Sequence, residues 1–331
     1  MGESSKPNNE TRKVAIVTGA ASGIGKALAT HLIRKGWRVA CCDIQEDAGA
    51  ALVAELGSNA VFFKLNVTDY DMQAKVFSQV WDKWKRLDAL LANAGHSDRS
   101  SIYILNHRGK TEIPPKPALL SLKACYESFL YGVQLAIHFM RMNDVPGGQI
   151  VATSTIASIH PHQTFPEYCG AKAAVSSLNL THHYDCPRLS FRPIMRKDQS
   201  VRANSSTGSE IGKKIRVGGV KSVLTILQKD NITLNAVLPG IVATGAVPQA
   251  SLDATDPAHL TAVETVVEAY DKCLTQPNLN GQLVECSVDK HIFLPLLELG
   301  NGDATKRACT VWEPLFEQKH GEKSGLPGAI L

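Results

Sequence analysis

Residues 13–25 read KVAIVTGAASGIG, an apolar run followed by a turn with three glycines. The apolar half, residues 13–18, has the pattern of a strand buried on both faces. Residues 24–35 then have helical spacing and close at Gly36. A glycine-rich turn between a strand and a helix lets backbone amides at the helix N-terminus approach a pyrophosphate. The stretch therefore predicts a dinucleotide-binding unit.

Strand-like and helical segments continue to alternate after this unit. Further strands are predicted at 38–42, 61–65, 87–92, 149–153, 232–238 and 282–287, with the last at the edge of the sheet. Helices are predicted at 47–56, 71–84, about 118–142 and from Tyr168 to about Leu180. This alternation predicts an α/β fold with a single doubly wound parallel sheet of the Rossmann type and helices on both faces.

One domain is expected over residues 12–331, after a polar N-terminal tail at 1–11. The distance from Lys172 to Pro239 is larger than the roughly 30 residues that one helix and one strand need. The excess falls at about 181–219, a polar and basic stretch expected to lie outside the core as an insertion. The segment is interpreted as a solvated loop or as part of an imperfect gene model, in preference to a nucleic-acid or membrane contact. A C-terminal extension is expected at about 290–331.

Composition excludes several classes of protein. With 44% hydrophobic and 20% charged residues, the chain can bury a large core. The net charge of +4 is spread along the chain, which gives nucleic-acid binding no support. No run of 18 apolar residues and no signal peptide are found, so no membrane contact is expected. The eight cysteines lack zinc-like or Cys-x-x-Cys spacing, which favours a reduced, cytoplasmic protein.

A second informative stretch, Tyr168-Cys169-Gly170-Ala171-Lys172, follows Gly19 by 149 residues. Its spacing puts a phenol and an ammonium on one helix face, one turn apart. A phenol with a pKa near 10 needs a nearby cation before it can exchange protons at neutral pH. In this order and at this distance, the two motifs resemble the short-chain dehydrogenase/reductase family. The resemblance implies a hydride-transfer enzyme.

The glycine spacing Gly-x-x-x-Gly-x-Gly is that family's variant, and the resemblance implies a nicotinamide cofactor site. Asp43 ends the second strand, where a carboxylate accepts hydrogen bonds from the ribose hydroxyls and repels a 2′-phosphate. NAD is therefore expected, with NADP less favoured. Asn66 stands where the family has an Asp beside adenine. The implied cofactor-binding residues are Gly19, Ser22, Gly23, Ile24, Gly25, Asp43, Asn66, Val67, Asn93, Ala94, Gly95, Tyr168, Lys172, Val242 and Thr244.

The family's catalytic set consists of an Asn, a Ser, a Tyr and a Lys. By resemblance, Tyr168 would exchange a proton with the substrate oxygen, while Lys172 would lower the phenol's pKa and hold the nicotinamide ribose. The Ser should stand 13 positions before the Tyr, and that position is Thr155. A Thr hydroxyl can donate the same hydrogen bond. Ser154 is the alternative if the register shifts by one residue.

The family's catalytic Asn has no obvious counterpart. Aligning the helix that precedes the fifth strand puts Cys125 in its place, or Phe129 in a register one turn later. Neither side chain can bend the helix and order a water molecule as the amide does. His160 and His162 could touch a substrate, but a metal pair would need a third ligand, so no metal is expected.

Two functions remain open. The first is NAD-dependent interconversion of a secondary alcohol and a ketone, with a small hydrophobic substrate. The chain is similar to prostaglandin-dehydrogenase-like members from filamentous fungi, which implies a role in secondary metabolism. The second is a non-redox protein on the same fold, an isomerase, cyclase or binding scaffold. Relatives usually pair as homodimers or homotetramers, unless the insertion blocks that face.

Overall fold

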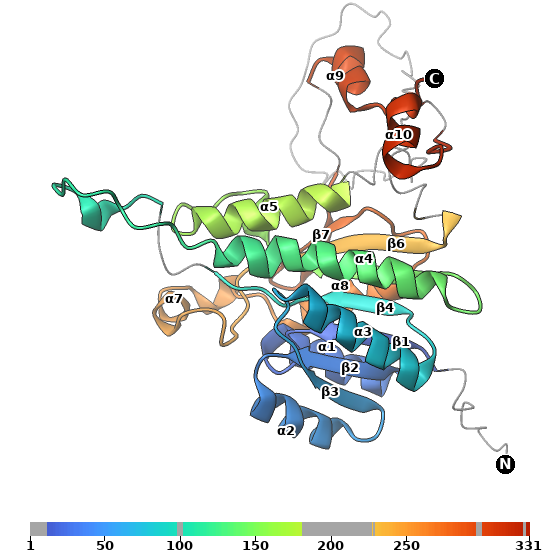
Figure 1. The fold of residues 1–331 in the computed structure, drawn as a ribbon. Helices are drawn as coiled ribbons and strands as arrows, with labels where there is room; N and C mark the ends of the chain where they lie inside the picture. The colour runs from blue at the N-terminus through green and yellow to red at the C-terminus, as the bar shows by residue number, and fades with distance from the viewer. Residues whose placement is uncertain (1–11, 98–101, 181–226, 228, 296–299, 327–328) are drawn as a thin grey trace, which may run out of the picture.

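The computed structural model describes residues 12–97, 102–180, 227, 229–295, 300–326 and 329–331 (Figure 1). The predicted N-terminal tail and the predicted insertion at 181–219 lie outside these residues. In the part of the chain that the structure describes, no helix is long and apolar enough to cross a membrane.

The described strands form one eight-stranded sheet in the order β3-β2-β1-β4-β5-β6-β7-β8. Every neighbouring pair from β3 to β7 is parallel, so the predicted doubly wound Rossmann-type sheet is confirmed. Each predicted strand forms within about two residues of its expected bounds. The strands are β1 (Val14–Thr18), β2 (Arg38–Asp43), β3 (Ala60–Lys64), β4 (Ala89–Ala92), β5 (Gly148–Thr153), β6 (Ile232–Pro239), β7 (Leu283–Ser287) and β8 (Lys290–Phe293).

The prediction that the seventh strand ends the sheet was wrong. β8 pairs antiparallel with β7, with Ser287 opposite Lys290. The tight connection passes through Val288, whose φ of 56° lies in the left-handed region. A β-branched residue is uncommon in that region. Because the connection carries Val288 in place of the glycine or asparagine typical of a hairpin turn, the sequence did not indicate β8.

Helices cover both faces of the sheet (Figure 1). One buried cluster, which includes Phe77, Phe139 and Val175, packs α3, α4 and α5 against one face. The other cluster, which includes Leu28 and Tyr270, packs α1, α2 and α8 against the opposite face. The helices are α1 (Gly23–Arg34), α2 (Glu46–Leu56), α3 (Tyr70–Trp84), α4 (Ser128–Arg141), α5 (Pro166–Leu180), α7 (Gln249–Asp253), α8 (Val263–Thr275), α9 (Gly302–Cys309) and α10 (Glu313–His320).

The predicted long helix at about 118–142 has an irregular first part. Leu122–Glu127 form a π-helical turn that leads directly into α4. A π-turn inserts a residue into the usual hydrogen-bond ladder and turns the side chains that follow it. Hydrophobic spacing alone could not predict this turn, because the buried positions across it, from Ser121 and Cys125 to Ser128 and Gly132, keep the spacing of an ordinary helix.

Candidate active site

The predicted site residues follow the carboxyl ends of β1 to β6 or lie on α5. The strand order reverses between β1 and β4, the position at which doubly wound sheets bind their ligands. The Thr18 hydroxyl accepts hydrogen bonds from the backbone N–H groups of Asn93 and Ala94, both at 3.1 Å. The Asn93 amide donates to the carbonyls of Thr18, at 3.1 Å, and Gly19, at 3.3 Å. The glycine turn and the Asn-Ala-Gly segment are therefore fixed to each other.

The glycine turn has the tight geometry that a pyrophosphate site needs. A Cβ on Gly25 would lie 1.9 Å from the carbonyl oxygen of Gly19, so no other residue fits there. Gly19 itself has a φ of +67°. α1 begins at Gly23, with Ser22 exposed before it and Ile24 half-buried after it. A compact turn at a helix N-terminus fits the phosphates of a dinucleotide.

Asp43 lies beside this turn and is 7% exposed. Its carboxylate accepts hydrogen bonds from the backbone N–H groups of Ala21, at 2.9 Å, and Gln45, at 3.0 Å. A carboxylate has about four acceptor positions, so it keeps capacity for ribose hydroxyls. Ile44, the next residue, is exposed and uncharged. The site thus has the chemistry for an adenosine ribose.

The other predicted cofactor residues differ in how they face the site. The Asn66 amide oxygen accepts hydrogen bonds from the N–H, at 3.1 Å, and hydroxyl, at 2.9 Å, of Thr68. Val67 is half-buried, whereas Val242 is buried in the core, so that only its backbone could reach a ligand. A Cβ on Gly23 would lie 3.1 Å from Thr244, which places the segment after β6 against the glycine turn.

Tyr168 and Lys172 lie one turn apart on α5, as predicted. The Lys172 ammonium lies 5.8 Å from the centroid of the Tyr168 ring and donates a 2.7 Å hydrogen bond to the Thr153 carbonyl. Burial raises the pKa of Tyr168 above its usual value, and the Lys172 charge lowers it by a smaller amount. The phenol therefore keeps its proton at neutral pH in this structure.

The two candidate hydroxyls after β5 point in different directions. Ser154 is buried, donates to the Lys172 carbonyl at 3.0 Å and contacts the Ser176 hydroxyl at 2.8 Å. Its hydroxyl therefore anchors α5. Thr155 is half-buried, and its hydroxyl lies 3.4 Å from the Pro239 carbonyl. Thr155 is thus the less buried of the two hydroxyl residues.

Of the two residues aligned with the family's Asn, Cys125 lies beside the predicted site and Phe129 packs in the core. A Cβ on Gly95 would lie 3.2 Å from both the Cys125 sulfur and the Lys172 ammonium, so these two groups flank the same residue. The Cys125 thiol donates to the His96 carbonyl at 3.4 Å. Phe129 is buried in the hydrophobic core.

One buried contact near the site was not predicted. The Thr153 hydroxyl donates to the Asn93 side-chain oxygen at 3.0 Å and also contacts the Tyr270 hydroxyl. Tyr270 comes from α8, on the opposite face of the sheet. Tyr270 thereby supports Thr153, whose carbonyl accepts the hydrogen bond from Lys172. No local motif marks Tyr270, because the contact spans 117 positions of sequence.

His160 and His162 are exposed on the segment between β5 and α5. The His162 ring nitrogen accepts a hydrogen bond from the backbone of Thr164 at 3.1 Å. Among the residues that the structure describes, no three His, Cys, Asp or Glu side chains are grouped so as to hold a metal ion.

The reversed strand order, the glycine turn and the Tyr-Lys pair together define a Rossmann-type oxidoreductase of the nicotinamide-dependent class. Comparison with known proteins identifies the family. The model for short chain dehydrogenases matches residues 13–188, and the chain belongs to the short-chain dehydrogenase/reductase family. Members of this family are oxidoreductases that bind nicotinamide cofactors and act on small molecules carrying CH–OH groups.

Two relatives and one solved structure are similar over about half of the chain or more. The short-chain dehydrogenase/reductase prx6 of Penicillium rubens is 42% identical, with both chains fully covered. The human 15-hydroxyprostaglandin dehydrogenase [NAD(+)] is 32% identical over 49% of this chain and 58% of its own. The crystal structure of a 3-ketoacyl-(acyl-carrier-protein) reductase from Brucella melitensis complexed with NADH has a TM-score of 0.63 at 15% identity. It covers 83% of this chain and 96% of its own, a likeness of fold alone.

Proposed function

We propose that this protein uses NAD(H) to interconvert a secondary alcohol and a ketone. The carrying observation is the Tyr168–Lys172 pair on α5, held to β5 by the bond from Lys172 to Thr153. Thr155 follows β5 with its half-buried side chain at the same edge of the sheet as the glycine turn. This arrangement supports proton exchange beside a bound nicotinamide.

In this proposal, the Thr155 hydroxyl donates a hydrogen bond to the substrate oxygen and orients it. Tyr168 gives its proton to that oxygen during ketone reduction and takes it back during alcohol oxidation. The nicotinamide, when bound, gives or accepts the hydride. Lys172 favours the ionised form of the phenol through its charge. Because burial raises the pKa of Tyr168, reduction should be favoured at neutral pH and oxidation should accelerate as the pH rises.

The preference for NAD rests on Asp43. Its buried carboxylate accepts two backbone hydrogen bonds at the end of β2. A negative charge there favours ribose hydroxyls and opposes a 2′-phosphate. Ile44 supplies no positive charge to offset it. The human relative named above carries NAD(+) in its name, which supports the same choice.

The substrate class is inferred from the segment that precedes α4. Ile102 and Leu105 are exposed, yet the segment is fastened near the catalytic helix. The Ile102 N–H donates to Glu167 at 2.6 Å, and the Tyr103 hydroxyl donates to the Gln163 carbonyl at 2.9 Å. Glu167 immediately precedes Tyr168. Apolar side chains held there favour a hydrophobic alcohol or ketone, such as a secondary metabolite.

A homodimer or homotetramer is expected, because the family commonly forms oligomers.

The test is a turnover assay with a panel of hydrophobic secondary alcohols, in which the absorbance of NADH reports the reaction. Turnover with NAD on at least one alcohol is expected, and the matching ketone should be reduced with NADH. Tight NAD binding without turnover on any alcohol or ketone would instead favour the non-redox alternative. The reason to consider that alternative is the replacement of the family's Asn.

A further inference from the structure

The π-turn before α4 is held from outside its own helix. Cys125 lies within this turn, and the Ser128 hydroxyl at its end donates to the Ala124 carbonyl at 2.8 Å. A π-turn shifts backbone hydrogen bonds away from their usual partners, so it persists where other groups satisfy them. These turns are frequent at functional sites.

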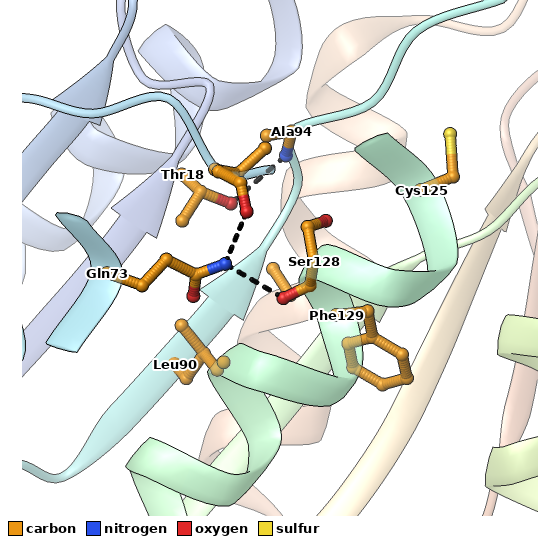
Figure 2. A pocket seen from close by; sticks show the side chains of 10 residues that line it. Thr18, Gln73, Leu90, Ala94, Cys125, Ser128 and Phe129 are labelled. Atoms are coloured by element: carbon orange, nitrogen blue, oxygen red, sulfur yellow. Dashed lines mark hydrogen bonds between the residues drawn. The ribbon is translucent and has the colours of Figure 1, made fainter. Parts of the chain in front are cut away.

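Gln73 of α3 contacts the end of this turn, and its side chain is only 2% exposed. Its amide nitrogen donates to the Ser128 carbonyl at 3.0 Å and to the Val67 carbonyl at 2.7 Å. Figure 2 shows the amide reaching from α3 to the first turn of α4. One buried side chain thus links the turn that carries Cys125 to Val67, a predicted cofactor residue. A buried amide that uses both hydrogens holds a definite geometry.

A small cavity lies next to this amide. Its volume is about 20 Å³, and its lining includes Thr18, Gln73, Ala94, Cys125 and Ser128 (Figure 2). That volume has room for one water molecule. The cavity extends from the glycine-turn side of the site to the π-turn. Gln73 is therefore placed to shape both sides at once.

We propose that Gln73 is a positioning residue that supports the bend at Cys125 from α3, in place of the missing catalytic Asn. The Cys125 thiol has a single weak donor, which goes to His96, so it cannot hold the bend alone. Gln73 supplies the donor to the Ser128 carbonyl that follows the π-turn. The bend in turn sets the distance between Cys125 and Lys172 around Gly95. This inference rests on the proposed function for its effect on turnover, but not for its effect on structure.

The structural arm of the test follows Cys125 itself. Gln73→Met keeps the length of the side chain and removes both donors. The alkylation rate of each cysteine by iodoacetamide would be followed by mass spectrometry in the unaltered protein and the variant. At least a ten-fold faster reaction is expected at Cys125, with no change at the buried Cys42. The control is Gln79→Met, an exposed residue of the same helix, which should change neither rate.

The catalytic arm uses a rescue. Gln73→Met should lower kcat at least ten-fold, while Cys125→Asn, which restores the family's residue, should make the enzyme insensitive to Gln73→Met. The kcat of the double variant should then lie within about three-fold of that of Cys125→Asn alone, a coupling that a merely packing role would not give. If Gln73→Met does not fold, Gln73→Asn, which keeps the amide but shortens its reach, replaces it in both arms.

The outcomes separate the two proposals. An unchanged Cys125 alkylation rate, or equal acceleration at Cys42, would overturn the role of Gln73. The role of Gln73 would also be overturned if Gln73→Met lowered kcat by the same factor in the unaltered protein and in the Cys125→Asn variant. An unaltered protein without turnover on any alcohol or ketone would contradict the proposed function, while the alkylation arm would still decide whether Gln73 holds the π-turn.

Discussion

Replacing Asp43 with alanine tests the cofactor assignment through two separable losses. The first is local, because the Asp43 carboxylate accepts hydrogen bonds from the N–H groups of Ala21 and Gln45. Leaving the buried N–H of Ala21 without an acceptor costs about 1–3 kcal/mol of folding free energy. That loss disturbs the glycine turn and should weaken NAD and NADP binding alike. The second loss concerns NAD only.

A hydrogen bond to a charged group contributes about 1.5–3 kcal/mol, which corresponds to roughly a 10- to 150-fold change in a dissociation constant. Asp43→Ala should therefore raise the Kd of NAD by at least ten-fold beyond the common loss. NADP should be spared this second loss, because removal of the carboxylate also removes its repulsion of the 2′-phosphate. The unaltered protein should prefer NAD by about ten-fold or more, and the variant should lose most of that preference.

Isothermal titration calorimetry with each cofactor measures both dissociation constants directly. Asp47→Ala is the matched control, because Asp47 is an exposed acid on α2, close in sequence to Asp43. It should leave both constants and their ratio unchanged. Equal constants for NAD and NADP in the unaltered protein, or a ratio that survives Asp43→Ala, would refute the reasoning.

Three further predictions follow from local geometry. Thr155→Ser should keep or raise kcat, because it retains the hydroxyl and removes a crowding methyl; steady-state kinetics would show a fall if Thr155 were misassigned. Gly25→Ala should cost about 3 kcal/mol or more, since its Cβ would lie 1.9 Å from the Gly19 oxygen, whereas Gly170→Ala, with no atom within 4 Å, should not destabilise the fold; equal melting temperatures would contradict this. Burial raises the folded-state pKa of three thiols, those of Cys41, Cys273 and Cys286, to about 12, while unfolded thiols ionise near 9.0. Stability should therefore fall as the pH rises from about 9 toward about 12. Melting curves across this range measure the loss, which should be smaller in a Cys273→Ala variant.

The sequence was sufficient to predict seven of the eight strands that the structure describes. Short apolar runs located β1 to β7, since a parallel strand buried on both faces reads as a continuous apolar run. The glycine spacing located a turn that only glycine can form at Gly25. The Tyr168–Lys172 spacing put both groups on one helix face, where the structure also has them. These features depend on neighbours in sequence, so local patterns reveal them.

Features that depend on distant contacts could not be predicted in this way. The π-turn before α4 keeps the hydrophobic spacing of an ordinary helix, and Gln73 contacts Ser128 across 55 positions. The net direction of the Tyr168 pKa was also missed. The spacing predicts that Lys172 lowers it, which it does, but burial by the surrounding chain has the larger effect. Burial is a property of the folded chain.

The most direct test of the proposed chemistry is the transfer of deuterium from a secondary alcohol, labelled at its carbinol carbon, to NAD. Mass spectrometry of the cofactor after turnover should find the label in NADH, at a rate that falls at least ~10²-fold in Tyr168→Phe, which removes the proton-exchanging hydroxyl. NAD affinity should be nearly unchanged in that variant. Conversion of the substrate with no label in the cofactor, or near-normal transfer by Tyr168→Phe, would contradict the account.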